Sequence, residues 1–322
     1  MFDEVKPVTL PQIDAARARL DGLSVVTPLL ACAAAPAGKS VHLKLENLQP
    51  IGSFKIRPIG NAVLSRAAAD LAAGIYTTST GNSALGVAYM ARRLGIAATA
   101  VVPATAPLAK LDKLRHLGTR IDMRSPEEWW SAIKSGAIDG QSGVYIDAVR
   151  DPASLAGDAT IGLEILAQSP GVQAILIPFG GGGLACGIAC AVRASRRDVK
   201  IIACELDSAH PVKAAFAAGV PTATAHHAGF VSGVGFGTVL TEMWPLVKSM
   251  IDDVITVSLT EVAGAIKIMV EQNHVVAEGA GAVSVAAALS GRYAATRVCA
   301  VVSGGNLDSS LLAAILDGRT PP

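Results

Sequence analysis

Lys55 is the residue whose neighbours most suggest chemistry, within the segment Ile51-Gly52-Ser53-Phe54-Lys55-Ile56-Arg57-Pro58. Pro58 fits the first turn of a helix, because its missing N–H would have no partner there. Lys55 then lies at the positive end of a helix between two apolar side chains, and both effects disfavour the ammonium form. A neutral amine can form a Schiff base with a carbonyl group. The alternative is an ordinary solvated lysine, since lysine is rarely buried.

Hydroxyl and amide side chains crowd a second segment, Thr77-Thr78-Ser79-Thr80-Gly81-Asn82-Ser83, between a strand-like run and a helix-like run. One Ser, Thr or Asn suffices to cap a helix, so an ordinary N-cap does not explain so many polar groups. A helix start with free N–H groups suits a carboxylate, which an amino-acid substrate carries. We predict a carboxylate site formed by Ser79, Thr80, Gly81, Asn82 and Ser83.

Four consecutive glycines, Gly180 to Gly183, precede Leu184 and follow the apolar run QAILIPF. Such a loop lets backbone N–H groups close round an anion at a helix N-terminus, so phosphate is the expected occupant; a merely flexible loop is the alternative. The segment also fits a dinucleotide-binding fingerprint, with Gly180, Gly182 and Ala185 in place and Glu205 ending the next strand-like run. A nicotinamide-dependent dehydrogenase is therefore the alternative function.

A fourth segment, Ser303-Gly304-Gly305-Asn306, follows the run RVCAVV. A turn that ends in an N-cap at Asn306 would explain it fully, so it is a weak signal alone. Its significance lies in combination with the other three, since ligands of layered α/β folds gather where loops leave the carboxyl ends of strands.

Short β-branched runs alternate with stretches of helical spacing along the chain, which predicts parallel sheets with crossover helices. Few polar residues interrupt the runs, as expected for strands covered on both faces. The fold class is therefore α/β. The predicted strands are VHLKLE, GIYTTS, AATAVVP, GVYID, QAILIPF, VKIIACE, DVITVS and RVCAVVS.

The composition of the chain indicates which partners and which cellular location to expect. The 322 residues are 51% hydrophobic and 16% charged with a formal net charge of +1, so neither a nucleic acid nor a membrane is an expected partner. No apolar run approaches the roughly 20 residues that a membrane span needs. The first residues do not resemble a signal peptide, and five cysteines without C-x-x-C spacing indicate buried free thiols. We expect a cytoplasmic enzyme.

Taken together, SFKIRPIGNA, STGNSALGVA, GGGGLACGIA and SGGN stand in the order and approximate spacing of the fold type II pyridoxal-phosphate enzymes. The chain is most similar to the branch of serine/threonine dehydratases and serine racemases, over nearly its whole length. The resemblance implies a two-domain, tryptophan synthase beta-like architecture with helices on both faces of parallel sheets. Residues 1–48 and 149–322 would form a large cofactor-binding domain, and residues 49–148 a small domain that binds the substrate carboxylate.

The resemblance also implies roles for individual residues. Lys55 would hold pyridoxal 5'-phosphate as a Schiff base, Phe54 would lie against the ring, and Asn82 would bind the ring hydroxyl. Ser303 would face the pyridine nitrogen. Further cofactor contacts would come from Gly180, Gly181, Gly182, Gly183, Leu184, Gly233 and Glu278.

The implied reaction is β-elimination. A hydroxyl beside the pyridine nitrogen cannot keep it firmly protonated, which weakens the ring as an electron sink and favours loss of a β-substituent. Lys55 would remove the Cα proton of a β-hydroxy amino acid, and a keto acid and ammonia would be released. Racemisation is the alternative within the family, with Thr80 as acid/base on the opposite face of the substrate.

Departures from the family pattern leave the substrate open. Ser83 stands where a histidine is usual, and Glu278 is followed by Gly279 rather than proline. These differences favour a less common β-hydroxy amino acid, such as a bulkier one, over serine or threonine. Family members that bind a divalent cation use a glutamate and an aspartate six residues later. Here Glu205 is present, but Pro211 stands at the position of the aspartate, so no metal is expected. The family implies a homodimer. Trp129 and Trp130 either line a substrate entrance or pack inward.

Overall fold

The computed structural model describes residues 2–104, 106, 108–136, 138, 140–225, 227 and 229–322. Its strands form two sheets. The larger sheet has the order β1-β2-β10-β7-β8-β9, and the smaller has the order β5-β4-β3-β6. The strands are β1 (Leu29–Ala31), β2 (Ser40–Lys44), β3 (Ile75–Thr77), β4 (Ala98–Pro103), β5 (Arg120–Arg124), β6 (Val144–Tyr145), β7 (Ala174–Pro178), β8 (Lys200–Leu206), β9 (Asp253–Val257) and β10 (Arg297–Val301).

Each of the eight predicted strands is present, and the predicted α/β class with parallel sheets is confirmed. All pairs in the smaller sheet are parallel. In the larger sheet β1 alone pairs antiparallel, with β2. The two strands that the sequence did not reveal, β1 and β5, lie at sheet edges, where short length or charged residues hide the apolar pattern of a buried strand.

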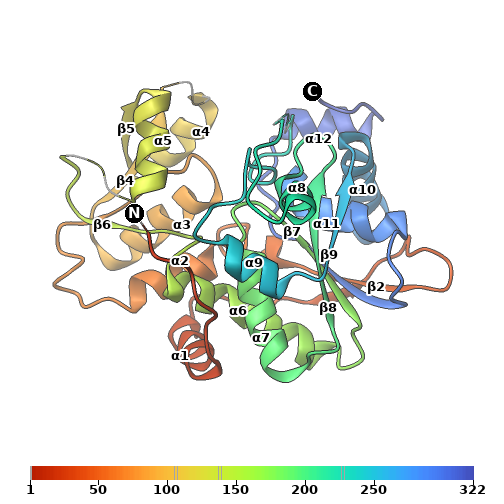
Figure 1. Cartoon of the computed structure of the whole chain (residues 1–322). Helices are drawn as coiled ribbons and strands as arrows, with labels where there is room; N and C mark the ends of the chain where they lie inside the picture. The colour runs from red at the N-terminus through yellow and green to blue at the C-terminus, as the bar shows by residue number, and fades with distance from the viewer. Residues whose placement is uncertain are drawn as a thin grey trace.

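Helices cover the sheets (Figure 1). They are α1 (Leu10–Leu20), α2 (Ile56–Leu64), α3 (Asn82–Leu94), α4 (Leu108–His116), α5 (Pro126–Ser135), α6 (Pro152–Gln168), α7 (Gly183–Ser195), α8 (Pro211–Ala218), α9 (Trp244–Met250), α10 (Leu259–Asn273), α11 (Gly279–Ser290) and α12 (Ser309–Leu316), with a 3-10 turn, η1 (Glu46–Leu48). None of the described helices combines the length and apolar character needed to cross a membrane.

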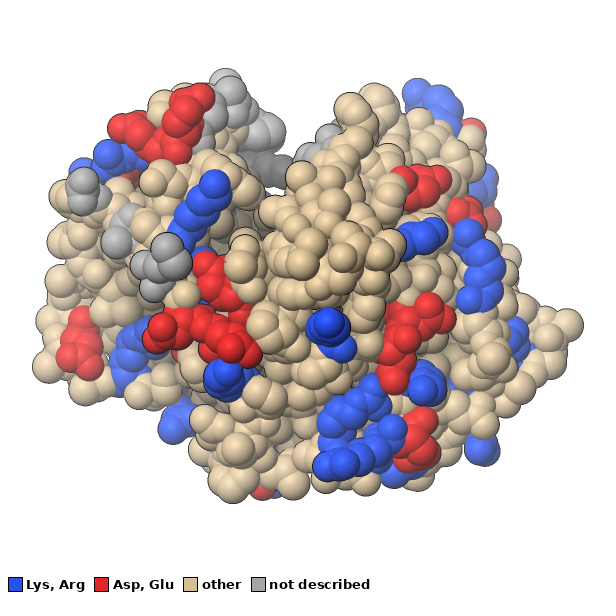
Figure 2. Space-filling model, in the orientation of Figure 1, with Lys and Arg blue, Asp and Glu red and all other residues tan. Residues whose placement is uncertain are grey.

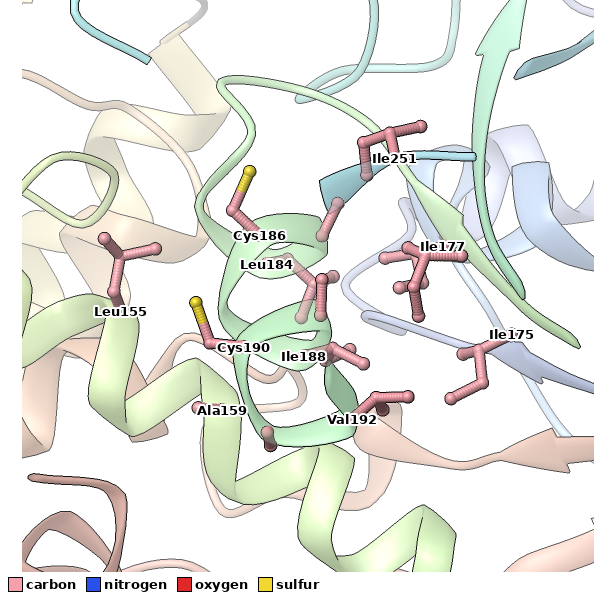
Figure 3. Close-up of a cluster of buried hydrophobic side chains, with 14 of the residues drawn as sticks. Leu155, Ala159, Ile175, Ile177, Leu184, Cys186, Ile188, Cys190, Val192 and Ile251 are labelled. Atoms are coloured by element: carbon pink, nitrogen blue, oxygen red, sulfur yellow. The ribbon is translucent and has the colours of Figure 1, made fainter. Parts of the chain in front are cut away.

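Alternate residues of the central strands face two separate cores. On β7, Ile175 and Ile177 belong to the cluster that includes α6 and α7, whereas Ala174 and Leu176 belong to the cluster that includes α10 and α11. Figure 3 shows the first cluster, with α7 between the strand and α6. Two of its cysteines, Cys186 and Cys190, lie on α7, where both are buried and serve as packing groups. The larger sheet is therefore covered on both faces.

Glycines let α2, α6 and α7 approach closely. A Cβ at Gly157 of α6 would lie 2.4 Å from the backbone oxygen of Arg57 on α2. A Cβ at Gly187 of α7 would lie 2.6 Å from the Cβ of Asp158 on α6. Neither position admits a side chain without a shift of the neighbouring helix. These contacts bring the starts of α2 and α7 to either side of Asp158.

A buried ion-pair network anchors α2. Arg57 is 1% exposed. Its guanidinium donates to both oxygens of Glu46 at 2.8 and 2.9 Å and to both oxygens of Glu164 at 2.7 and 2.9 Å. Lys44 also donates to Glu164. Fork-like, bidentate pairing of this kind fixes both position and orientation, so it holds the helix that begins beside Lys55.

Candidate active site

A cavity of about 630 Å³ lies between the two sheets and contains all four predicted loops. In the space-filling view a notch separates the two lobes of the molecule, and acidic and basic side chains are interspersed on this face (Figure 2). Every site residue predicted from the sequence lines the cavity. These residues are Phe54, Lys55, Ser79, Thr80, Gly81, Asn82, Ser83, Gly180, Gly181, Gly182, Gly183, Leu184, Gly233, Glu278 and Ser303.

Lys55 is the N-cap of α2, as the position of Pro58 predicts. Its Nζ lies 4.6 Å from the centre of the Phe54 ring, and in the described part of the chain it makes neither a hydrogen bond nor an ion pair. Burial lowers the pKa of this amine, while Asp158 and Asp147 act in the opposite direction without cancelling the effect. The lowered pKa makes the neutral, nucleophilic form of the Lys55 amine easier to reach.

The first and fourth loops are joined by backbone hydrogen bonds. Phe54 N donates to Ser303 O at 2.9 Å, and Gly305 N donates to Gly52 O at 2.8 Å, on either side of a bridge between Ser53 and Gly304. The lysine and the serine are thus held in fixed register although they are almost 250 residues apart in the sequence. Ser303 is buried, and its hydroxyl makes no hydrogen bond to the described residues.

The second loop is fixed by an amide and carboxylate chain. Asn82 Nδ2 donates to Glu278 Oε1 at 2.6 Å, and Asn306 Nδ2 donates to Asn82 Oδ1 at 2.8 Å. Asn306 also donates to Ile51 O. The interpretation of Asn306 as a helix N-cap is wrong, because α12 begins after Asp308; the side chain links loops instead.

The hydroxyls of the second loop do not cap α3. Its N-cap is Gly81, which has no side chain, and Ser79 Oγ accepts a hydrogen bond from Gly81 N at 3.1 Å. The first-turn N–H groups of α3 consequently point to the cavity end of the helix without a side-chain partner. Thr80 and Ser83 line the cavity with no hydrogen bond to described residues. This arrangement suits an anion better than it suits capping.

The glycine loop is a cradle in which side chains would not fit. A Cβ at Gly180 would lie 2.3 Å from Gly233 O, and a Cβ at Gly181 would lie 2.9 Å from the side chain of Val149. Gly182, the N-cap of α7, has φ of 98°, which favours glycine. The loop therefore offers backbone N–H groups at the positive end of a 13-residue helix.

Sequence reasoning missed several cavity residues at the end of β6 and just after it. Tyr145, Asp147 and Val149 all line the cavity. Asp147 accepts hydrogen bonds from Val149 N and Arg150 N at 2.9 and 3.0 Å, and its other oxygen pairs with Arg150 Nε at 2.6 Å. An acidic residue directly after a strand-like run was the available signal. Trp129, which the sequence left undecided, also lines the cavity.

Asp158 was missed as well. It lies behind the glycine cradle, where its Oδ2 is 3.4 Å from the position that a Cβ of Gly183 would occupy. The side chain is fully buried, and neither carboxyl oxygen has a hydrogen-bond partner among the described residues. Burial raises the pKa of Asp158 to about 8, although nearby Lys55 lowers it. No periodicity distinguishes this residue from an exposed helix acid.

Glu205, the acid required for the dehydrogenase alternative, lies elsewhere. It is fully buried, and its two oxygens accept hydrogen bonds from Val212 N and Lys213 N at 2.9 and 3.0 Å, at the start of α8. It does not line the cavity, so it is not placed to bind a ribose there. Within the described ranges, no group of three or more His, Cys, Asp or Glu side chains is arranged to hold a metal ion.

Residues 21–304 match the model of the family described as pyridoxal-phosphate dependent enzymes. The chain belongs to this family. A putative threonine dehydratase of Sinorhizobium fredii is 33% identical to it over 98% of each chain. An L-threonine ammonia-lyase of Thermotoga maritima is 35% identical over 87% of this chain and 70% of its own. Maize serine racemase superposes with a TM-score of 0.85 at 29% identity, covering 97% of this chain and 98% of that one.

The cavity of this pyridoxal-phosphate dependent enzyme fits the family's cofactor. An aldehyde requires an amine that is neutral, and Lys55 has a lowered pKa and an Nζ without a polar partner among the described residues. A phosphate requires convergent donors, and the cradle of Gly180 to Gly183 supplies backbone N–H groups where a side chain would collide. The orphaned hydroxyl of Ser303 is a further partner that suits a ring nitrogen.

Proposed function

We propose that this enzyme is an ammonia-lyase that removes the β-hydroxyl of a serine- or threonine-like amino acid and yields a 2-keto acid and ammonia. The observation that carries the proposal is the presence, in one cavity, of the Lys55 amine, a loop suited to a carboxylate and a cradle suited to a phosphate. The names of the relatives from Sinorhizobium fredii and Thermotoga maritima support the same reaction class.

We assign the holding roles as the sequence predicts. Gly180 to Gly183 and Leu184 would hold the phosphate, with Gly233 closing the cradle. Lys55 would hold the aldehyde carbon covalently, and Phe54 would lie against the ring. Asn82, itself oriented by Glu278, would bind the ring hydroxyl, and Ser303 would bind the ring nitrogen.

The substrate carboxylate would lie at the start of α3, on the hydroxyls and N–H groups of residues 79–83. Thr78, just before this loop, is fixed by Trp129 Nε1, which donates to its carbonyl at 3.1 Å, and by a 3.0 Å hydrogen bond between its hydroxyl and that of Tyr145. A rigid loop positions the Cα proton with little entropy loss on reaction. We also propose that residues 49–148 form the small domain that contributes this loop.

The cofactor, when bound, supplies an electron sink for the electrons released at Cα. Lys55 would take the Cα proton, because a neutral amine held at the cavity wall is a competent general base. The β-hydroxyl would depart as water after receiving a proton, and the same quantity of water is consumed when the amino group is released as ammonia. One water is released and one is consumed, so the overall reaction needs no external oxidant or reductant.

Racemisation is a second candidate. Thr80 supports it, because its side chain lines the cavity without a hydrogen bond to described residues, and maize serine racemase is similar to this chain. Incubation with L-serine separates the outcomes, since D-serine and pyruvate report racemisation and elimination. Thr80→Ala should abolish D-serine formation alone; loss of ammonia release as well would give Thr80 a different role.

The proposed function is tested with the purified protein. We expect a yellow protein whose chromophore becomes fixed on the peptide containing Lys55 after borohydride reduction, and ammonia release from at least one of serine, threonine, 3-hydroxyaspartate and phenylserine. Lys55→Ala should abolish both, whereas Lys248→Ala, at an exposed position of α9, should abolish neither. A protein that stays colourless with added pyridoxal phosphate refutes the proposal.

We propose a cytoplasmic location and a homodimer. The location is supported by Cys32, Cys186, Cys190, Cys204 and Cys299, which are all buried free thiols and suit a reducing compartment. The homodimer is supported by the family resemblance. Mass measurement in solution tests the dimer.

A further inference from the structure

We infer that the substrate of this site is a β-hydroxy amino acid with an aromatic β-substituent, of the phenylserine class. The inference rests on the proposed function, because it names the substrate of the same reaction. It comes from the walls of the cavity beyond the groups that would hold the cofactor and the substrate carboxylate.

The wall nearest the carboxylate loop is made of aromatic faces. Trp129 and Tyr145 each bind Thr78 with their only polar atom, so their rings are fixed beside the loop and present carbon to the cavity. Burial raises the pKa of Tyr145 to about 12, which keeps its hydroxyl neutral. Trp130 lies with its ring centre 6.2 Å from that of Trp129, and Ile133 follows one helical turn later on the same wall.

The segment between α8 and α9 adds more apolar side chains to the cavity. They are Phe230, Val234, Phe236 and Leu240, which line it together with Ser232 and Thr238. Phe236 reaches within 3.4 Å of the position of a Cβ at Gly180 and is 38% exposed. A large aromatic side chain that stays this exposed in a cleft leaves apolar surface for a ligand to cover. The cavity therefore offers aromatic faces from two separate segments of the chain, residues 129–145 and residues 230–236, to a β-substituent of the substrate.

Most donors of the charged cavity residues already have partners. Arg150 donates to Asp147 Oδ2 and to Ile133 O at 2.6 Å, and its guanidinium carbon lies 3.5 Å from the ring centre of Phe2, whereas its Nη1 is buried without a hydrogen-bond partner among the described residues. Lys113 Nζ donates to Asn306 Oδ1 at 3.3 Å. 3-Hydroxyaspartate, which would bring a second carboxylate to Arg150 Nη1, is therefore the competing substrate class that the second experiment below distinguishes from a phenyl-bearing one.

A small substituent would leave the aromatic walls in contact with water. Hydrophobic pockets discriminate by about 10- to 200-fold for a single methylene group, so a buried phenyl ring should give a preference of at least this order. We expect kcat/KM for L-threo- or L-erythro-phenylserine to exceed that for L-threonine by about 10- to 100-fold.

The first experiment uses the wild-type holoenzyme and a binding readout that requires no elimination. L-Phenylalanine lacks the leaving group, and L-2-aminobutyrate is its small counterpart. We expect the visible spectrum to be perturbed at an at least 10-fold lower concentration of L-phenylalanine than of L-2-aminobutyrate, on the order that an apolar pocket gives. Equal or reversed affinities overturn the inference whatever the enzyme catalyses.

The second experiment measures ammonia release from both phenylserine diastereomers, threonine, serine and 3-hydroxyaspartate. Faster turnover of threonine, serine or 3-hydroxyaspartate overturns the inference and leaves the ammonia-lyase proposal intact. Preferential binding of L-phenylalanine with no ammonia from any substrate has the reverse meaning: the aromatic site stands and the proposed reaction fails.

Variants test which side chains produce the preference for phenylserine over threonine. Trp129→Ala should reduce the ratio of kcat/KM for phenylserine over threonine by about 10-fold, mainly through KM, because it removes a wall rather than a reacting group. Trp129→Phe keeps a ring and should retain most of the ratio. Phe216→Leu is the matched control, since Phe216 is a partly exposed aromatic residue that packs on Trp244 outside the cavity. A ratio that Trp129→Ala leaves unchanged overturns the assignment of this wall.

Discussion

Asp158→Asn should stabilise the apoenzyme, and the gain should grow as the pH rises. Asp158 is fully buried without a hydrogen-bond partner among the described residues, and burial raises its pKa from 3.8 to about 8. The native state therefore keeps the proton that the unfolded chain releases near pH 4. Because the folded pKa is raised, the stability associated with this acid is fully present below pH 3.8 and is lost as the pH rises toward 8.

The size of the effect on the unfolding free energy follows from the pKa shift of Asp158. Each unit of pKa difference is worth about 1.4 kcal/mol, so retaining the proton at pH 7 costs the wild type about 4 kcal/mol. An asparagine has nearly the same shape and no proton to retain, although burying its amide also carries a cost of about 1–3 kcal/mol. Between pH 5 and pH 8 the stability difference between variant and wild type should grow by about 4 kcal/mol.

The assay is urea unfolding of both apoenzymes at pH 5, 6, 7 and 8. Lys55 faces Asp158 and has a lowered pKa; this makes stability rise with pH up to the unfolded lysine pKa, and the effect is largely shared by both proteins. Glu46, Arg57 and Cys186 also act electrostatically with Asp158 and are unchanged. Asp70→Asn, at an exposed position, controls for the loss of one carboxyl. A difference that stays constant from pH 5 to pH 8 would show that native Asp158 is ionised, and the reasoning would be wrong.

Two further variants test the cradle and the anchor of α2. Gly180→Ala places a Cβ 2.3 Å from Gly233 O, so the affinity for pyridoxal phosphate should fall by at least about 10-fold, roughly 1.4 kcal/mol. Fluorescence titration with pyridoxal phosphate measures this affinity. The control is Gly237→Ala, whose Cβ would meet no atom within 4 Å and which should bind the cofactor normally. Arg57→Met leaves the buried carboxylate of Glu46 without its main partner and should cost about 3–5 kcal/mol of unfolding free energy. A midpoint of urea unfolding within error of the wild type would contradict this.

The loops of the site are easier to predict from the sequence than the walls between them. Strand exits, glycine runs and clustered hydroxyls are local signals, so the sequence alone identifies Lys55, residues 79–83 and Gly180 to Gly183. The alternative explanation of Asn306 as a cap fails because the role of this residue depends on a contact with Asn82, 224 residues away. No local pattern encodes such a contact.

Buried polar residues are harder still to predict. Asp158 and Arg57 occupy helices whose polar residues ordinarily face water, so each would be assigned to a solvated face. Their burial follows from the close approach of α2, α6 and α7, which glycines permit. The spacing of glycines on α6 and α7 is visible in the sequence, but which helices they bring together depends on the topology.

Arg57 and Lys55 are two residues apart and have opposite electrostatic surroundings, and this contrast explains why the pKa of the arginine is raised while that of the lysine is lowered. The carboxylates of Glu46 and Glu164 are both bound by Arg57, and neither residue lines the cavity. Two other acids raise the pKa of the lysine. Burial raises the pKa of Asp158 to about 8, and the oxygens of Asp147 accept hydrogen bonds from Val149 N, Arg150 N and Arg150 Nε. Among the described residues neither carboxyl group forms an ion pair with Lys55, and burial, the largest of these influences, lowers the pKa of the lysine. The ion pairs that hold α2 in place are made by Arg57 and do not involve the Lys55 amine.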